Sequence, residues 1–328
     1  TARVSTFLGN SVNLYCSAKQ SLTLMKHLYN VDGFIYGVLE LKALTTLISL
    51  FLFAHLSSGS ATAQSARTEP ASALLYEISG PGLNKPSYLF GTIHLICEKD
   101  MFSSERMMTY LDRTEQLVLE MDVGDPAMMH KVLMASMMSD GKTVKDHVTP
   151  EEYAKIDSLF KEYLGVSFEA LNKLKPMMSS TYIFTSPKIL GCQPPVMYEN
   201  YLRQAASQRK IAIIGLETVE EQIAAIDANS LDSQLSDLKK ISTDPQAKIS
   251  DFRKMFEVYL SQDSDELYRY TEKQFEGSGL AAEKMLDGRN QRWIPKIEKA
   301  MGAKPTFIAV GAAHLGGKKG VVTLLRAK

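Results

Sequence analysis

Four short apolar segments, each followed by a glycine or a polar residue, constrain the fold of this chain most strongly. They are residues 88–90, 116–119, 211–214 and 306–310. Dense apolar runs of this length are typical of strands that are buried on both faces. Because segments with helical periodicity separate them, the sequence predicts an α/β fold, with a mainly parallel or mixed central sheet covered by helices. The helical segments are long, so we expect long helical insertions between the strands.

The segments around these runs show where a hairpin and several helices belong. The stretches "ALLYEISG" and "SYLF", joined by a Gly-Pro turn, predict a hairpin whose second strand leads into the stretch "GTIH". Thr149, Pro150 and Glu152 form a helix start signal, with an N-cap, a proline in the first turn and a capping box. Apolar periodicity predicts helices over 103–114, 127–138, 151–164 and 199–208, and a block of helices over 231–302.

The N-terminal part of the chain has the pattern of an export signal. Lys42 precedes the apolar run 43–56, and Ala61 and Ala63 form a small-x-small site. We therefore expect cleavage near Gln64 and an exported protein, periplasmic or extracellular, without stable membrane insertion after processing. The alternative is an uncleaved membrane anchor, although the run is shorter than the ~20 residues that span a bilayer.

This signal divides the chain into two parts. We expect residues 1–63 to be a leader that includes the signal peptide, and residues 64–328 to form a single domain. Because the chain starts with Thr1, the residues before about 37 have a second interpretation, as sequence that is not translated.

The charge balance argues against polyanionic partners. The chain has 37 basic and 37 acidic residues and no long block of either sign. Electrostatic capture of nucleic acid or of an anionic membrane needs a basic excess. We therefore expect no nucleic acid as a partner.

Cysteine usage is consistent with an oxidising compartment. Apart from Cys16 in the predicted leader, the chain has only Cys97 and Cys192. Two cysteines in an exported protein predict one disulfide. Two separate buried thiols are the alternative, because a spacing of 95 residues carries no geometric information by itself.

Polar side chains follow the four predicted strands. They are His94, Glu120, Glu217 and His314. Ligands of parallel sheets bind at the carboxyl ends of the strands, where the loops separate. If the four strands are neighbours, two imidazoles and one or two carboxylates converge in one crevice.

Two of these strands end in the same Gly-x-x-His pattern. Gly91 precedes His94 and Gly311 precedes His314, and a residue without Cβ lets the chain leave the strand so that the histidine turns inward. Two histidines and a carboxylate form a common ligand set for a divalent transition metal, so Mn, Co, Fe and Zn are the candidate ions. A histidine in such a place is otherwise often a satisfied core residue.

The motifs also resemble a known family when they are taken in order. The stretches "LFGTIHL", "LVLEMD", "GLET", "RNQRW" and "VGAAHLGGKKGVVTLLR" resemble the TraB/GumN family, to which the Tiki proteases belong, and the chain is most similar to its bacterial GumN-type branch. The resemblance implies a fold like that of erythromycin-esterase and ChaN-like proteins. For the Tiki branch it implies a metal-dependent protease, whose motif residues correspond here to Gly91, His94, Glu120, Gly311 and His314.

These observations lead to one main functional hypothesis and two alternatives. The main one is an exported metal-dependent hydrolase that acts on a polypeptide or a small-molecule substrate, with His94, Glu120 and His314 as metal ligands. The resemblance implies a peptidase. Glu217 is then the candidate general base, and Arg289 is placed to stabilise a developing oxyanion or to form an ion pair. The alternatives are a non-enzymatic periplasmic module that binds haem, iron or a peptide, and an esterase-like hydrolase that acts on other substrates.

Two further residues are assigned structural roles. His130 lies among methionines at helical spacing, which indicates core packing rather than metal binding. Glu199 begins a predicted helix, where a carboxylate interacts favourably with the macrodipole. No Gly-x-Ser-x-Gly motif and no P-loop motif occurs in the chain.

Overall fold

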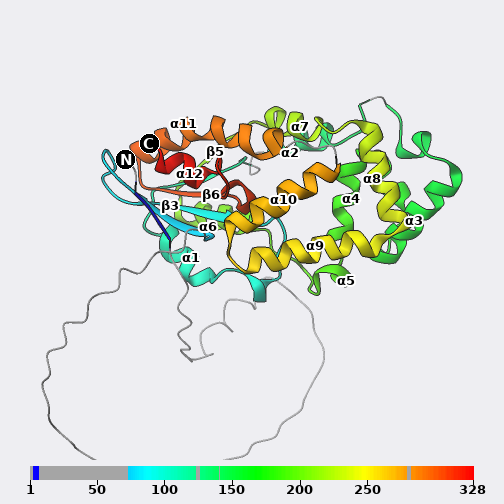
Figure 1. Cartoon of the computed structure of the whole chain (residues 1–328), viewed down its shortest axis with the longest axis horizontal. Coiled ribbons are helices and arrows are strands. Elements are labelled where there is room, and N and C mark those ends of the chain that lie inside the picture. Colours follow the sequence, from blue (N-terminus) through cyan, green and yellow to red (C-terminus); the bar gives the residue numbers. More distant parts are fainter. Residues whose placement is uncertain (1–2, 7–72, 123–125, 140, 279–281) are drawn as a thin grey trace, which may run out of the picture. The chain divides into compact units, whose positions relative to one another are not determined.

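A single mixed sheet of six strands lies at the centre of a computed structural model of the protein, which describes residues 3–6, 73–122, 126–139, 141–278 and 282–328 (Figure 1). The strands are β1 (Arg3–Thr6), β2 (Leu75–Ser79), β3 (Ser87–Thr92), β4 (Gln116–Leu119), β5 (Ala212–Gly215) and β6 (Thr306–Gly311). Their spatial order is β1-β2-β3-β6-β4-β5.

The pairing of the strands confirms the predicted fold class. β1, β2 and β3 pair antiparallel, which includes the predicted hairpin, and β3, β6, β4 and β5 pair parallel. The four segments predicted as strands are therefore neighbours. β3, β4 and β6 are buried as predicted, but the prediction was wrong for β5, which lies at the edge of the sheet with Ile214 39% exposed. β1 falls within the predicted leader, whereas the predicted signal peptide and its cleavage site lie outside the described residues.

Helices connect and cover these strands. Among the described residues they are α1 (Ser104–Leu111), α2 (Pro126–Ala135), α3 (Pro150–Leu164), α4 (Pro176–Thr181), α5 (Pro187–Leu190), α6 (Tyr198–Arg209), α7 (Val219–Ile226), α8 (Leu231–Thr243), α9 (Pro245–Leu260), α10 (Ser264–Ser278), α11 (Gly288–Ala303) and α12 (Val321–Arg326). None of the described helices combines the length and the apolar character needed to cross a bilayer.

Each face of the sheet has its own hydrophobic cluster. On one face, α11 and α12 pack against the strands, and the fully buried Trp293 contributes to the same cluster as Ile308. On the other face, α1 and α6 pack against the strands, with Phe90 and Tyr198 in edge-to-face contact at 5.3 Å between ring centroids. The sheet is thus the middle layer of three, as expected for strands that are apolar on both faces.

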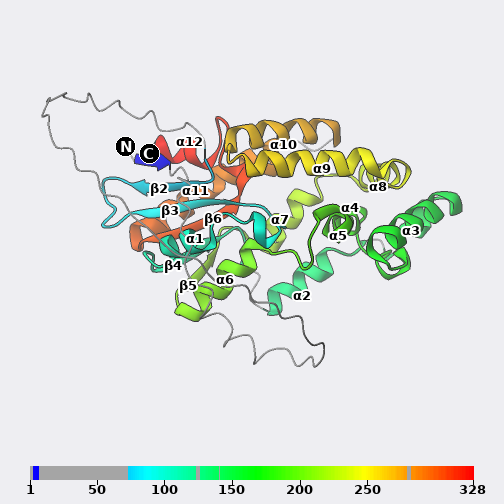
Figure 2. The ribbon, with the colours of Figure 1, turned by 90° about the horizontal axis from the view of Figure 1, so that it is seen from below.

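A third cluster belongs to the helical insertion rather than to the sheet. Phe160 of α3 and Leu238 of α8 are buried in it. Figures 1 and 2 show α3, α4 and α8 grouped away from the strands. α3 begins as predicted, because Thr149 accepts from the Glu152 N–H at 3.2 Å and donates its own N–H to that side chain at 2.9 Å. A local capping signal therefore fixes the start of this helix.

The predicted disulfide is present. Cys97 follows β3 and is bonded to Cys192, which precedes α6. An antiparallel bridge between Ile96 and Val196 supports the same connection. These links hold the loop after β3 next to the start of α6.

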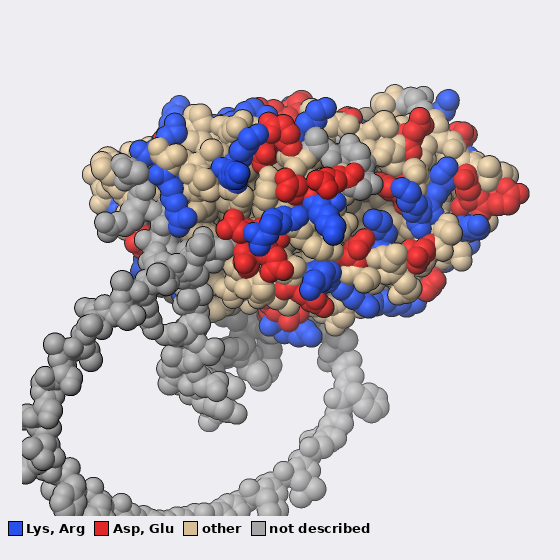
Figure 3. All heavy atoms as spheres, viewed as in Figure 1, with Lys and Arg blue, Asp and Glu red and all other residues tan. Residues whose placement is uncertain are grey.

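The methionine-rich helix α2 corrects one expectation. At its described end, Leu133 and Met134 are 52% and 55% exposed, so the interpretation of this helix as core is wrong there. With α7 it forms an open groove of about 660 Å³ that His130 also lines. The prediction failed because helical spacing of apolar residues does not show whether a partner covers them. Figure 3 shows basic and acidic side chains interspersed over the face displayed, in keeping with the zero net charge.

Candidate active site

The carboxyl ends of the four parallel strands bring the predicted polar residues to one edge of the sheet. β3 and β6 are in register at Thr92 and Gly311, and β4 pairs with both β6 and β5. Beyond β4 and β5 the pairing continues, because the N–H of Glu217 donates to the carbonyl of Glu120 at 2.8 Å. The two glutamates therefore lie side by side as a direct result of the parallel register.

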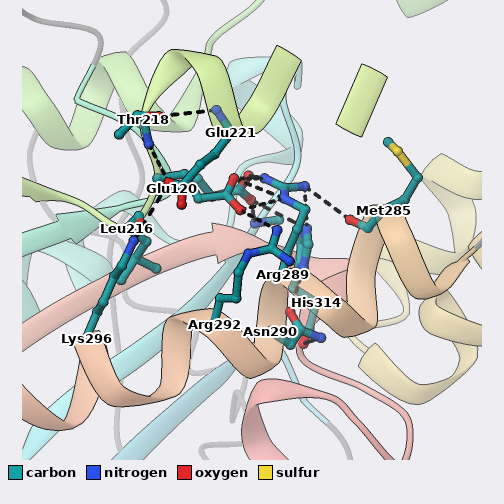
Figure 4. Close-up of polar contacts among 12 residues, drawn as sticks. Glu120, Leu216, Thr218, Glu221, Met285, Arg289, Asn290, Arg292, Lys296 and His314 are labelled. Carbon is teal, nitrogen blue, oxygen red and sulfur yellow. Dashed lines mark hydrogen bonds and ion pairs between the residues drawn. The ribbon is translucent and has the colours of Figure 1, made fainter. Parts of the chain in front are cut away.

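Arg289, from the first turn of α11, joins these glutamates (Figure 4). Its Nε and Nη2 donate to the Glu217 carboxylate at 2.8–3.1 Å, and Nη2 also donates to Glu120 Oε2 at 2.7 Å. Its Nη1 donates to the carbonyl of Met285 and lies 3.2 Å from His314 Nε2. A guanidinium that is 6% exposed needs such pairing, because a buried charge without partners is costly.

The tautomer of His314 follows from its contacts with Asn290. The Asn290 amide nitrogen donates to two carbonyl oxygens, those of His314 and Lys319, so its Oδ1 faces His314 Nδ1 at 2.7 Å. Nδ1 therefore carries the proton, and Nε2 presents its lone pair toward Arg289 and Glu120. Burial lowers the pKa of His314 to about 3, with the nearby Arg289 acting in the same direction, so the imidazole is neutral at pH 7.

Glu120 is the central acceptor of the site. Its Oε1 accepts from the Gly311 N–H at 2.7 Å and lies 3.9 Å from His314 Nε2. Burial by itself would raise the pKa of Glu120, but the charges of His314 and Arg289 outweigh it and lower that pKa to about 2. His314 contributes to this shift because it is itself charged in the acid range where Glu120 titrates. Glu120 is therefore ionised, and His314 neutral, over the physiological range.

The two motif glycines are required by close packing. A Cβ on Gly91 would lie 2.7 Å from a methyl group of Leu315 and 2.9 Å from Ala312 Cβ, and a Cβ on Gly311 would lie 3.2 Å from Glu120 Oε1. The sequence analysis attributed both glycines to the turn toward the histidine. The structure adds a more specific reason, because the first motif packs against the second and the second packs against Glu120.

His94 occupies a different environment from His314. Its side chain is 79% exposed, and its Nδ1 lies 3.8 Å from Glu199 Oε1. Burial raises the pKa of Glu199 above its usual range, while the charge of His94 opposes this effect. Sequence analysis missed Glu199 as a site residue, because its position at a helix start already accounted for an acidic side chain. The predicted Cys97–Cys192 disulfide was the available signal, because it places the segment before α6 next to the loop that follows His94. The bridge between Ile96 and Val196, which no sequence pattern indicates, completes this placement.

The donor set fits a divalent ion in chemistry and, in part, in position. Glu120 Oε1 and the unprotonated His314 Nε2 are 3.9 Å apart, which two ligands of one ion can be. His94 follows the neighbouring strand β3 but is not gathered with them, and no cluster of at least three His, Cys, Asp or Glu suited to a metal occurs in the part of the chain that the structure describes. Arg289 also lies against His314 Nε2 and against Oε2, the other carboxylate oxygen of Glu120, so an ion would share these two residues with it. Glu120 and His314 are thus close enough together to share an ion.

Fold and site together define a class: an α/β protein with a buried charged cluster at the carboxyl edge of its parallel strands. The family model of the TraB/PrgY/gumN family matches residues 74–328, and the chain belongs to this family. No curated protein and no solved structure matches the chain.

Proposed function

We propose that this protein is an exported hydrolase that cleaves polypeptides with a divalent ion held by His94, Glu120 and His314. The observation that carries the proposal is the pair formed by Glu120 and His314. An ionised carboxylate and a neutral imidazole with an unprotonated Nε2 are the protonation states that metal ligands need. Asn290 holds the His314 ring from the far side, as partners behind ligating histidines do.

The surrounding residues support hydrolysis around such an ion. A divalent ion held by these residues would supply Lewis acidity, which would polarise a carbonyl group and lower the pKa of water. Arg289 offers a fixed positive charge that can stabilise negative charge developing on a substrate oxygen. Glu217 uses both carboxylate oxygens to hold Arg289, which favours an anchoring role over the general base predicted from sequence.

Metal content and proteolysis test this proposal together. Purified protein is stripped of metal, offered manganese, cobalt, iron or zinc, and analysed for bound metal and for cleavage of a denatured polypeptide. We expect uptake of one ion and cleavage that a chelator abolishes. His94→Ala and His314→Ala should each lose most of the affinity, and the double variant little more, because the ligands act as a unit. His130→Ala, on the exposed α2, is the matched control and should bind as the wild type does, and circular dichroism checks each fold. Wild-type uptake by folded His94 and His314 variants would refute the shared site.

Export is supported by the disulfide and is tested separately. Disulfides persist in oxidising compartments, and Cys97 is bonded to Cys192. The intact mass of protein recovered from its native host should correspond to a chain that starts at or near Gln64. A mass that retains residues 43–56 would instead indicate a membrane anchor.

A hydrolase that works without metal is the second candidate, and one observation favours it. The Arg289 guanidinium already contacts both Glu120 Oε2 and His314 Nε2, so the site contains a cation of its own. Cleavage of esters or peptides that persists in excess chelator, and that is lost in Arg289→Lys, would support this candidate over the first.

A further inference from the structure

The two Gly-x-x-His units share a feature that extends beyond the motif. In each unit, Nδ1 of the histidine faces an oxygen carried by the first turn of a helix. For His314 this is Asn290 Oδ1 on α11, at 2.7 Å, and for His94 it is Glu199 Oε1 on α6, at 3.8 Å. We infer that Glu199 is the positioning residue of His94, holding its proton on Nδ1 so that Nε2 is free to face the site. The role of Nε2 as a metal ligand rests on the proposed function, whereas the contact between Glu199 and His94 does not.

Thr92 fixes the carboxyl group of Glu199 for this role. Its hydroxyl donates to Glu199 Oε1 at 2.9 Å, so Oε1 is the acceptor oxygen of the group. Thr92 lies two residues before His94, within the same Gly-x-x-His unit. An Oε1 that accepts from Thr92 is also oriented to accept from a histidine N–H. Oε1 can accept in this way whether or not the carboxyl group of Glu199 is ionised, because a proton on that group would be carried by Oε2.

The distance of 3.8 Å is longer than a hydrogen bond and has to shorten to about 3 Å. The His94 ring has room to make this movement, because its side chain is 79% exposed. The carboxyl group, by contrast, is already held in place by Thr92.

A helix-start role does not account for the environment of Glu199. An acidic residue that only complements a helix dipole is effective at the surface, as Glu151 is in the first turn of α3. Glu199 is instead mostly covered, and its Oε2 is buried without a hydrogen-bond partner in the structure. Burying a carboxyl group in this way is unfavourable, so a function of the group explains its place better than helix stability does.

Covalent and backbone links keep Glu199 opposite His94. Ile96 and Val196 exchange two backbone hydrogen bonds, of 2.7 and 3.0 Å, and the Cys97–Cys192 disulfide closes the same connection. α6 begins immediately afterwards, at Tyr198. The contact therefore belongs to a fixed part of the molecule.

The tautomer of His94 tests the inference without any metal. The full chain is labelled with ¹⁵N-histidine, stripped of metal and studied at a pH of about 8, where an ordinary imidazole is neutral. Long-range ¹H–¹⁵N spectra distinguish a proton on Nδ1 from one on Nε2. His94→Gln assigns the His94 signal among the six histidines of the chain. We expect the wild type to carry the proton on Nδ1, whereas free imidazole side chains prefer Nε2.

Three variants and one control separate positioning from folding. Glu199→Ala should return His94 to the Nε2–H form and weaken divalent metal binding by about 10- to 100-fold, as loss of a partner behind a ligating histidine does. Thr92→Val should shift the tautomer in the same direction, because the carboxyl group loses its donor. Glu199→Gln keeps an oxygen at the position of Oε1 and should retain the Nδ1–H form. Glu151→Ala removes an acidic first-turn residue elsewhere and should change neither quantity.

Failure of this inference can be distinguished from failure of the proposed function. If folded Glu199→Ala and Thr92→Val leave the His94 tautomer unchanged, Glu199 does not position His94, whatever the metal result. If the tautomer shifts as expected but the wild type takes up no manganese, cobalt, iron or zinc, the positioning role stands and the metal site of the proposed function is refuted.

Discussion

The ends of β3 and β6 carry the same Gly-x-x-His motif but place its histidine in opposite environments. His314 is 5% exposed and lies between Asn290 and Arg289, whereas the His94 side chain is 79% exposed. β6 lies between β3 and β4, and α11 packs against the turn that follows it. The comparison shows that the Gly-x-x-His motif determines how the chain leaves the strand. The elements that pack around the strand end determine whether the histidine is buried and which residues it contacts.

The ion pairs around the buried His314 should contribute far more to the stability of the fold than the surroundings of the exposed His94 do. Replacing Arg289 with Ala removes the buried cation that joins Glu120 and Glu217 and leaves Glu217 with the more distant, exposed Arg292, so it should lower the free energy of unfolding by about 3–5 kcal/mol. Urea unfolding measures the change. Arg292→Ala is the matched control, because its side chain is 52% exposed and lies 3.7 Å from Glu217. Equal losses in the two variants would contradict the central role of Arg289.

Acid should destabilise the metal-free protein through the same buried end. The pKa of His314 is about 3 in the folded chain against about 6.5 unfolded, so only the unfolded chain gains this proton as the pH falls from 6.5 to 3. Glu120 adds a similar loss between pH 4.5 and 2, because its folded pKa is about 2. The free energy of unfolding should therefore drop by a few kcal/mol below pH 6.5.

The variant His314→Gln tests this prediction. In unfolding experiments between pH 7 and 5, it should remove most of the pH dependence attributed to His314. An unchanged slope in this variant would contradict the role assigned to the buried end.

The glycines of the two motifs should differ in the quantity that they affect. Gly91→Ala forces a Cβ into Ala312 and Leu315 and should cost about 1–3 kcal/mol of stability. Gly311→Ala meets Glu120 Oε1 at 3.2 Å, so it should cost less stability and should disturb metal binding more. Thermal unfolding and metal titration of both variants provide the measurements. A larger stability loss at Gly311 would contradict the packing argument.

The smallest effect on stability is expected at the exposed histidine. His94→Ala should change the free energy of unfolding by no more than about 0.5 kcal/mol, because it removes few contacts. Under the proposed function the same change should abolish tight metal binding. A clear loss of stability without a change in metal affinity would identify His94 as a structural residue.

Much of the fold was predictable because its signals are local. The apolar runs at β3, β4, β5 and β6 are dense enough to be recognised as strands, and Thr149 marks the start of α3. The convergence of Glu120, Glu217 and His314 also followed, since parallel strands place their carboxyl ends at one edge. The exposed helix α2 was mistaken for core, because periodicity reveals an apolar face but not what covers it.

The sequence by itself determined the strand ends, the polar residues that follow them and the two cysteines that pair. Tertiary structure alone decided that Arg289 joins two glutamates, that His314 is buried while His94 is exposed, and that Glu199 faces His94. The physical reason is the separation along the sequence over which each kind of signal acts. Strand and cap signals act over a few residues of the chain, whereas burial, tautomer and ion pairing depend on groups that lie 24 to 169 residues apart in sequence and meet only when the sheet and its covering helices assemble.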